Sequence, residues 1–199
     1  TITDSSVAAA ALNALDGKTT VAINASNITT LTGSAADLNT TYTASGNGSI
    51  SGLGNEAVTL SDTTLAVSVL NTLDGNTSGA INASSINTLT GSAADLITAY
   101  ASSGISDLRN EAVNVNTGTA STSQANTLAA DTFNVVTATI SDGDMATLAG
   151  LTETGNAYTI TITDSSVAAA ALNALDGKTT VAINASNITT LTGSAADLN

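Results

Sequence analysis

The chain has 199 residues, of which 42% are hydrophobic and only 2% aromatic, and it contains no Pro, Trp, Cys or His. Sixteen acidic residues against three basic ones give a net charge of −13, which repels phosphate groups, so nucleic acid is excluded as a partner. Without Cys or His the chain has neither disulfides nor the usual nucleophile–base pairs, and we do not expect an enzyme.

The first predicted helix lies between Asp4 and Gly17. Asp4 is its predicted cap, because a carboxylate accepts the backbone amides that a first turn leaves unpaired, and Gly17 fits the left-handed position just past its end. A helix of a second type is predicted at the sequence GSAADL. There Ser34 is the cap and Asp37 stands three residues on, as in a capping box.

The same signals return later in the chain. Residues 57–62 alternate apolar side chains with Thr or Ser, which is the pattern of a half-buried strand. The next helix is predicted from the cap Asp62 to Gly75. Its apolar face is formed by Ala66, Val69, Leu70 and Leu73. Ser92 and Asp95 then repeat the second cap signal.

The chain repeats itself on two scales. Residues 161–199 copy residues 1–39 without a change, which gives a period of 160. Within one period, residues 12–38 align with 70–96, and a shorter third version begins at residue 126. We therefore divide the chain into one full unit, 1–160, and the start of the next unit, 161–199. The full unit contains three sub-repeats, at about 1–57, 58–112 and 113–160. Because both ends fall inside a repeat, we expect the chain to be a piece of a longer protein.

This repetition predicts the fold class. Strand-like segments recur every ~20–36 residues, the length of one coil in an α/β solenoid. Since parallel strands joined by helices take right-handed connections, we predict a right-handed α/β repeat solenoid, with short parallel strands on one side and short capped helices on the other. The alternative is a parallel β-helix, in which turns replace the helices. The Ala-rich run at 7–15 favours the helical version.

Several motifs resemble a known class of proteins. SGLGNEAVTLSDT at 51–63, LNTLDG at 70–75 and TLTGSAADL at 88–96 are similar to the repeats of giant cell-surface proteins of marine cyanobacteria, including those needed for non-flagellar swimming. The resemblance covers residues 1–112 and 161–199. It implies an extracellular or cell-surface location and carries over no catalytic residue. No apolar run approaches the ~20 residues of a transmembrane helix, so no membrane insertion is expected.

The densest acidic spot is SDGDMA at 141–146, where Asp142 and Asp144 flank Gly143. Calcium prefers oxygen ligands, so these two carboxylates are the candidate metal ligands and Ca²⁺ the candidate cofactor. The paired-glycine nonapeptide of calcium-binding β-rolls is absent, as is the Glu of an EF-hand loop. The structural alternative is that Asp142 caps a helix ending at Gly150 and that Asp144 lies in its first turn.

These observations favour a structural extracellular repeat protein, a segment of a rod, stalk or filament at the cell surface that assembles end to end with other copies of itself. The alternative is an adhesin-type module that binds glycans or other cell-surface components. Such a module needs an exposed aromatic platform, and the candidates weighed for it are Tyr42, Tyr100 and Tyr158. Tyr42 and Tyr100 each follow a Leu by four residues on a predicted helix face, so we expect them to be packed.

Overall fold

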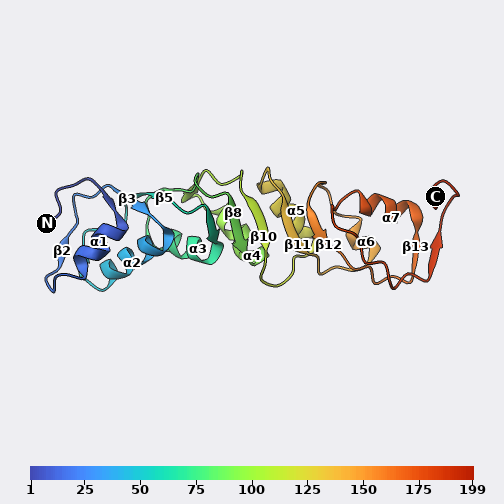
Figure 1. Ribbon diagram of the computed structural model, residues 1–199, viewed down its shortest axis with the longest axis horizontal. Helices are drawn as coiled ribbons and strands as arrows, with labels where there is room; N and C mark the ends of the chain where they lie inside the picture. The colour runs from blue at the N-terminus through green and yellow to red at the C-terminus, as the bar shows by residue number, and fades with distance from the viewer. The chain divides into compact units, whose positions relative to one another are not determined.

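The computed structural model describes residues 1–199, which fall into two compact units. Residues 1–89 and 98–108 form the first unit, and residues 90–97 and 109–199 form the second. Each unit is built of short parallel strands and short helices in alternation (Figure 1). The α/β prediction is confirmed at this level, and helices are present where the β-helix alternative would have turns.

The first unit contains β1 (Ser6–Ala8), α1 (Ala9–Asp16), β2 (Ile23–Asn24), β3 (Thr30–Gly33), α2 (Ala35–Gly46), β4 (Ile50–Ser51), β5 (Ala57–Leu60), β6 (Thr64–Ala66), α3 (Val67–Asn76), β7 (Ile81–Asn82) and β9 (Ile105–Ser106). The second unit contains β10 (Ala112–Val115), α5 (Thr122–Asp131), β11 (Val136–Thr139), α6 (Met145–Leu148), β12 (Ala157–Thr159), β13 (Ser166–Ala168), α7 (Ala169–Asp176) and β14 (Thr190–Thr192). Two elements have residues in both units: β8 (Thr88–Gly91) and α4 (Ala93–Ala101).

The sheet of the first unit has five parallel strands in the order β1-β3-β5-β7-β9. Their register stacks one aliphatic side chain from each strand: Val7 pairs with Leu31, Leu31 with Val58, Val58 with Ile81, and Ile81 with Ile105. Leu31, Val58 and Ile81 are at most 1% exposed. This aliphatic ladder forms much of the core of the first unit.

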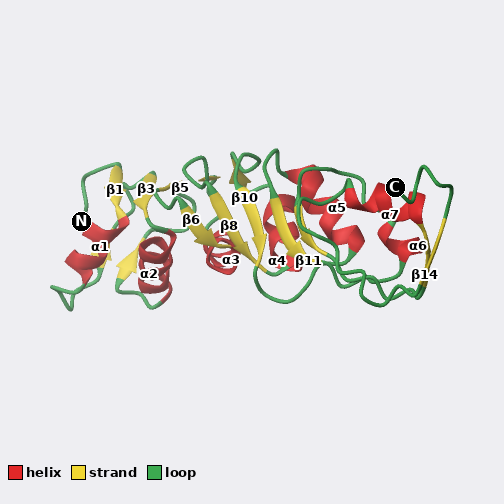
Figure 2. Ribbon diagram, turned by 45° about the vertical axis from the view of Figure 1, so that its right-hand side comes forward, coloured by secondary structure: helices red, strands yellow, loops and turns green.

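Helices cover the core on the side away from these strands. Figure 2 shows β1, β3 and β5 following one another on one side of the first unit, with α1 and α2 on the other. Helix α2 packs against both α1 and α3, and an Asn on one helix reaches the next: Asn39 Nδ2 donates to the carbonyl of Val69 at 3.1 Å. In the second unit β10, β11 and β12 are likewise parallel neighbours, and β13 pairs with β14. No helix is long and apolar enough to span a bilayer.

Two predicted helix starts are wrong. Helices α1 and α3 begin at Ala9 and Val67, and their N-cap positions are alanines that make no side-chain capping bond. Neither Asp4 nor Asp62 caps the helix that follows it, because residues 6–8 and 64–66 form strands β1 and β6 first.

The ends of these helices also differ from the prediction. Gly17 is a C-cap but has a right-handed backbone with φ −67, and α3 continues through Gly75 to Asn76. The serine caps of the second signal are confirmed, because the Ser34 hydroxyl accepts the amide of Asp37 at 3.1 Å and Ser92 accepts that of Asp95 at the same distance. The Asp37 carboxylate accepts the Ser34 hydroxyl, at 2.7 Å, and does not complete a capping box.

The two identical segments have different neighbours and bury different side chains. In residues 1–39, Leu12, Leu31 and Leu38 are at most 1% exposed, because the residues that follow cover them. At the same positions in residues 161–199, Leu172 is half-buried, Leu191 is 43% exposed and Leu198 is 50% exposed. We call the surface formed by these three positions in each copy its trailing face.

The opposite surface of the segment is exposed in the first copy and covered in the second. In residues 1–39, Ile2 is half-buried, Leu15 is 42% exposed and Val21 is 75% exposed. In residues 161–199 the residues that precede the segment cover these positions, so that Ile162 is 0% exposed, Leu175 is 2% exposed and Val181 is half-buried. We call this surface the leading face. One sequence thus has two apolar faces, and each is buried only where a neighbouring segment lies against it.

Candidate functional site

The structure places Asp142 and Asp144 at the starts of two different helices. Asp144 is the N-cap of α6, and its carboxylate accepts the amide of Thr147 at 2.8 Å. This hydrogen bond holds the pKa of the Asp144 carboxyl below its usual range. The structural alternative supposed that Asp142 caps α6, and that is wrong. Its carboxylate accepts the amide of Thr122, the first residue of α5, at 2.7 Å.

Asp142 is one of three aspartates whose carboxylate accepts the first backbone amide of an earlier helix. Asp62 accepts the amide of Ala35, the first residue of α2, and Asp164 accepts the amide of Met145, the first residue of α6, each at 2.7 Å. In each case the carboxylate comes from a later segment and binds the helix of an earlier one. The first amides of a helix have no partner within it and carry its partial positive charge. These bridging aspartates, Asp62, Asp142 and Asp164, therefore tie neighbouring segments together.

Asp4 has the same sequence environment as Asp164 but a different position in the fold. Asp4 is exposed, and its carboxylate accepts no helix amide, whereas Asp164 is half-buried against α6. Asp164 meets α6, which lies earlier in the chain. The bridging role thus depends on the neighbour and not on the local sequence.

The acidic residues do not gather into a metal centre. No group of three or more acidic side chains is placed so that it could hold a metal ion. The carboxylates of Asp142 and Asp144 instead accept backbone amides from two different helices. Calcium binding by these two residues stays a prediction.

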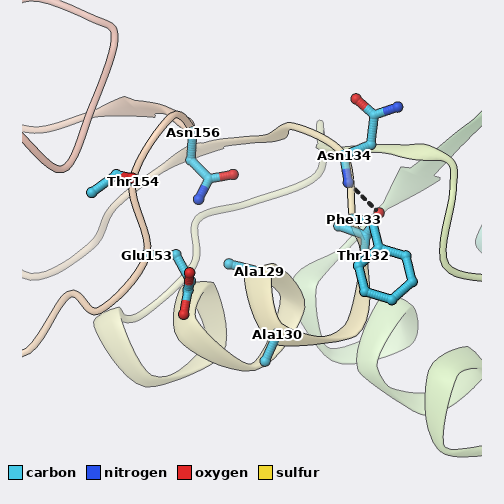
Figure 3. Close-up of a pocket in the computed structure, with 8 residues that line it drawn as sticks. All are labelled: Ala129, Ala130, Thr132, Phe133, Asn134, Glu153, Thr154 and Asn156. Carbon is cyan, nitrogen blue, oxygen red and sulfur yellow. Dashed lines mark hydrogen bonds between the residues drawn. The ribbon is translucent and has the colours of Figure 1, made fainter.

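A hollow of the surface lies beside the end of α5. It is a depression of about 480 Å³ lined by Ala129, Ala130, Thr132, Phe133, Asn134, Glu153, Thr154 and Asn156 (Figure 3). Figure 3 shows the Phe133 ring at one end and the side chains of Glu153 and Asn156 at the other. Phe133 is 78% exposed, so an aromatic surface is open to solvent beside polar groups. We call this feature the Phe133 depression.

The backbone around Phe133 is held firmly although its side chain is exposed. The Phe133 amide donates to the carbonyl of Arg109 at 2.7 Å, and the hydroxyl of Thr132 donates to the carbonyl of Glu111 at 2.6 Å. Across the depression, buried Asn156 accepts the amide of Val136 at 2.8 Å. The exposed ring therefore projects from a fixed backbone.

Sequence reasoning considered the three tyrosines for an aromatic platform and missed Phe133. Tyr42 and Tyr158 are 6% and 1% exposed, and Tyr100 is half-buried. The packing expected for Tyr42 is confirmed, and burial raises the pKa of both Tyr42 and Tyr158 to about 12. The only signal for Phe133 in the sequence is its place directly after the end of a helix, outside any apolar periodicity.

Comparison with protein-family models, curated proteins and solved structures gave no match. The resemblance to the repeats of giant cyanobacterial cell-surface proteins therefore stays a prediction.

Proposed function

We propose that the protein is a structural repeat protein, a segment of a long rod, stalk or filament at the cell surface, built as a right-handed α/β solenoid. One observation supports this most directly. The identical segments 1–39 and 161–199 bury opposite apolar faces, according to which neighbour is present. A repeat that needs a neighbour on both sides is the unit of an open-ended array, whereas an enzyme domain closes its core by itself.

The parallel ladders support the solenoid. Partners such as Leu31 and Val58, or Val58 and Ile81, are separated by about 25 residues, the length of one coil. The bridging aspartates and the Asn side chains that reach a neighbouring coil add polar links between coils. The extracellular location rests on the family resemblance alone, and antibody labelling of intact source cells tests it.

Negative-stain electron microscopy of the purified chain, with calcium and with a chelator, tests the proposal. We expect long filaments of uniform width, because stacking of repeats buries apolar faces that are otherwise exposed to solvent. Filaments that vanish with chelator would also support calcium as a link between copies. Separate particles in both conditions would contradict self-assembly and leave the chain as a covalent spacer.

The Phe133 depression favours a second candidate, an adhesin-type module. Sugars bind to proteins through aromatic rings that cover their apolar faces and through polar side chains at their hydroxyls. Phe133 supplies a ring, and Glu153, Asn134 and Thr154 supply polar groups around the same hollow. A glycan is therefore the ligand class that this surface fits.

Glycan-array binding of the wild-type chain and of Phe133→Ala tests this second candidate. We expect any bound glycan to be lost on removal of the ring. Val21→Ala is a matched control, because Val21 is similarly exposed, at 75%, and lies far along the chain from this depression. Equal binding by both variants would contradict a role for Phe133.

A further inference from the structure

One polar group of the Phe133 depression has no partner within the chain. Asn156 is only 5% exposed, and its Oδ1 accepts the amide of Val136 at 2.8 Å, but its Nδ2 donates to no atom of the protein. Figure 3 shows this nitrogen turned into the hollow, toward Glu153. The Thr122 hydroxyl is the only side-chain group that is both fully buried and unpaired, so the Asn156 Nδ2 is open to the hollow. A donor in this position needs an acceptor from outside the chain.

The backbone holds Asn156 in place. Its carbonyl accepts the amide of Thr180 at 2.9 Å and the hydroxyl of the same residue at 3.2 Å. The chain reaches Asn156 through Gly155, whose φ of +82 is strained for any other residue. Together with the bond to Val136, these contacts fix the direction of the free donor. A group fixed in this way loses little conformational freedom when a ligand binds.

We propose that the Phe133 depression binds an oligosaccharide of N-acetylated sugars. A sugar ring stacks on Phe133, and the carbonyl of an acetamido group accepts the hydrogen bond from the Asn156 Nδ2. This inference rests on the second candidate function, glycan binding, and names the class of glycan.

The lining of the hollow matches each part of an acetamido group. Its carbonyl oxygen only accepts hydrogen bonds, as the Asn156 Nδ2 requires. Its N–H needs an acceptor, and the exposed Glu153 carboxylate lies beside Asn156 (Figure 3). Its methyl group needs an apolar contact, and half-buried Ala129 and exposed Ala130 supply one in the same hollow. A sugar hydroxyl uses only the polar part of this set.

The size of the surface favours more than one sugar unit. The depression, at about 480 Å³, lies within the range of ~300–1,000 Å³ that is usual for ligand sites. A second hollow of about 190 Å³ shares Phe133 and Asn156 with it and adds Val135. Phe133 is 78% exposed and Val135 is 41% exposed, so apolar surface continues from one hollow to the next.

Charge argues against two other classes of ligand. Glu153 lines the hollow and the chain has a net charge of −13, which disfavours acidic sugars. An ammonium group would be attracted by Glu153 and by the face of the Phe133 ring. However, an ammonium group only donates hydrogen bonds and leaves the Asn156 Nδ2 without an acceptor. A neutral ligand with a carbonyl group meets all three residues.

Three trisaccharides of the same linkage test the inference on the full chain by isothermal titration calorimetry. They differ in one substituent of each ring: chitotriose carries an acetamido group, cellotriose a hydroxyl group and the glucosamine trimer an ammonium group. We expect chitotriose to bind most tightly. Cellotriose and the glucosamine trimer should bind about tenfold more weakly or worse, because they lose the carbonyl and the methyl group.

Asn156→Asp separates the donor from the fold. The new carboxylate still accepts the Val136 amide but donates nothing, so we expect chitotriose to bind about tenfold more weakly and cellotriose to be affected less. Asn24→Asp is the matched control. Asn24 is exposed, and its Oδ1 likewise accepts a backbone amide, that of Ser26 at 3.0 Å. The same change of charge there should leave binding unaltered.

Phe133→Ala should weaken binding of chitotriose and cellotriose alike, because both stack on the ring. Glu153→Ala, at an exposed position, tests the acetamido N–H without disturbing the core and should weaken chitotriose more than cellotriose. Circular dichroism checks that each variant is folded. The comparison of ligands on the wild-type chain needs no variant at all.

The outcomes distinguish this inference from the glycan candidate. Equal affinity for chitotriose and cellotriose, lost in Phe133→Ala, would overturn the acetamido assignment while glycan binding stood. A preference for chitotriose that persists in Asn156→Asp would overturn the role of Asn156. Tightest binding of the glucosamine trimer would make the hollow a cation site. Binding of none of the three would overturn both this inference and the glycan candidate.

Discussion

A carboxylate that accepts the first amide of a helix satisfies a donor that the helix cannot satisfy itself. Asp62, Asp142 and Asp164 each do this for a helix that belongs to an earlier segment. Capping bonds of this kind contribute about 0.5–2 kcal/mol. For Asp62 and Asp164 the donor and the acceptor lie in different sub-repeats, so that free energy stabilises the junction between the sub-repeats as well as the helix.

Asp4 and Asp164 occupy the same position in the two identical segments, and we expect their removal to affect stability differently. Asp164→Ala should lower the free energy of unfolding by about 1 kcal/mol, because the Met145 amide loses its acceptor. Asp4→Ala should change it little, since Asp4 is exposed and caps no helix. Urea denaturation of the two monomeric variants measures both. Equal losses would mean that the hydrogen bond across repeats contributes nothing to stability.

A second residue-scale prediction concerns alkaline pH. Burial raises the pKa of Tyr42 and of Tyr158 to about 12 in the folded chain, above the ordinary value of 10.0, and the Glu56 carboxylate beside Tyr42 acts in the same direction. Their contribution to stability is therefore complete below pH 10 and is lost as pH rises towards 12. Each of the variants Tyr42→Phe and Tyr158→Phe should lose part of the tyrosinate absorbance change that wild type shows near pH 12, because one of the two buried tyrosines remains in each. Loss of a transition near pH 10 instead would contradict their burial.

At the scale of elements, most of the pattern could be predicted from the sequence. Alternation of short strands and helices, and the Ser34 and Ser92 caps, follow from local signals. The starts of α1 and α3 could not be predicted in this way, because three residues before each helix join a strand whose partner lies elsewhere in the chain. Local capping rules favoured Asp4 and Asp62, whereas strand pairing fixed the start.

The candidate site was harder to predict, for the same physical reason. Asp142 binds a helix that begins 20 residues before it, and no local pattern specifies that register. Phe133 is exposed only because of how the chain leaves α5 and passes residues 153–156, which no periodicity indicates. The sequence could show which residues were acidic or aromatic, but not which neighbours they would meet.

The trailing faces give an element-scale prediction. Leu38→Ala should lower the free energy of unfolding by about 2–5 kcal/mol, because Leu38 is 0% exposed and its truncation leaves a cavity. Leu198→Ala should have a much smaller effect, since Leu198 is 50% exposed. Chemical denaturation followed by circular dichroism compares them. Similar losses at both positions would show that the trailing face of 161–199 is covered in solution.

At the scale of the whole molecule, stability should depend on the number of repeats. In an array the free energy is roughly the sum of terms for each repeat and for each junction, and junction terms are usually favourable. A chain in which residues 1–160 occur twice before residues 161–199 adds repeats and junctions but no new kind of contact. Its thermal midpoint should exceed that of the 199-residue chain by several degrees, with the same helix content per residue. An unchanged midpoint in circular dichroism would mean that the junctions are not coupled.

The identity of residues 1–39 and 161–199 also bears on how such a protein changes through generations. When a gene gains or loses one whole period by recombination between its copies, every residue in the product still meets a neighbour of a kind that it met before. No compensating substitution is needed, so length varies without any test of new packing. A gain or loss of one period would therefore change the length of the chain and no kind of contact between neighbouring segments.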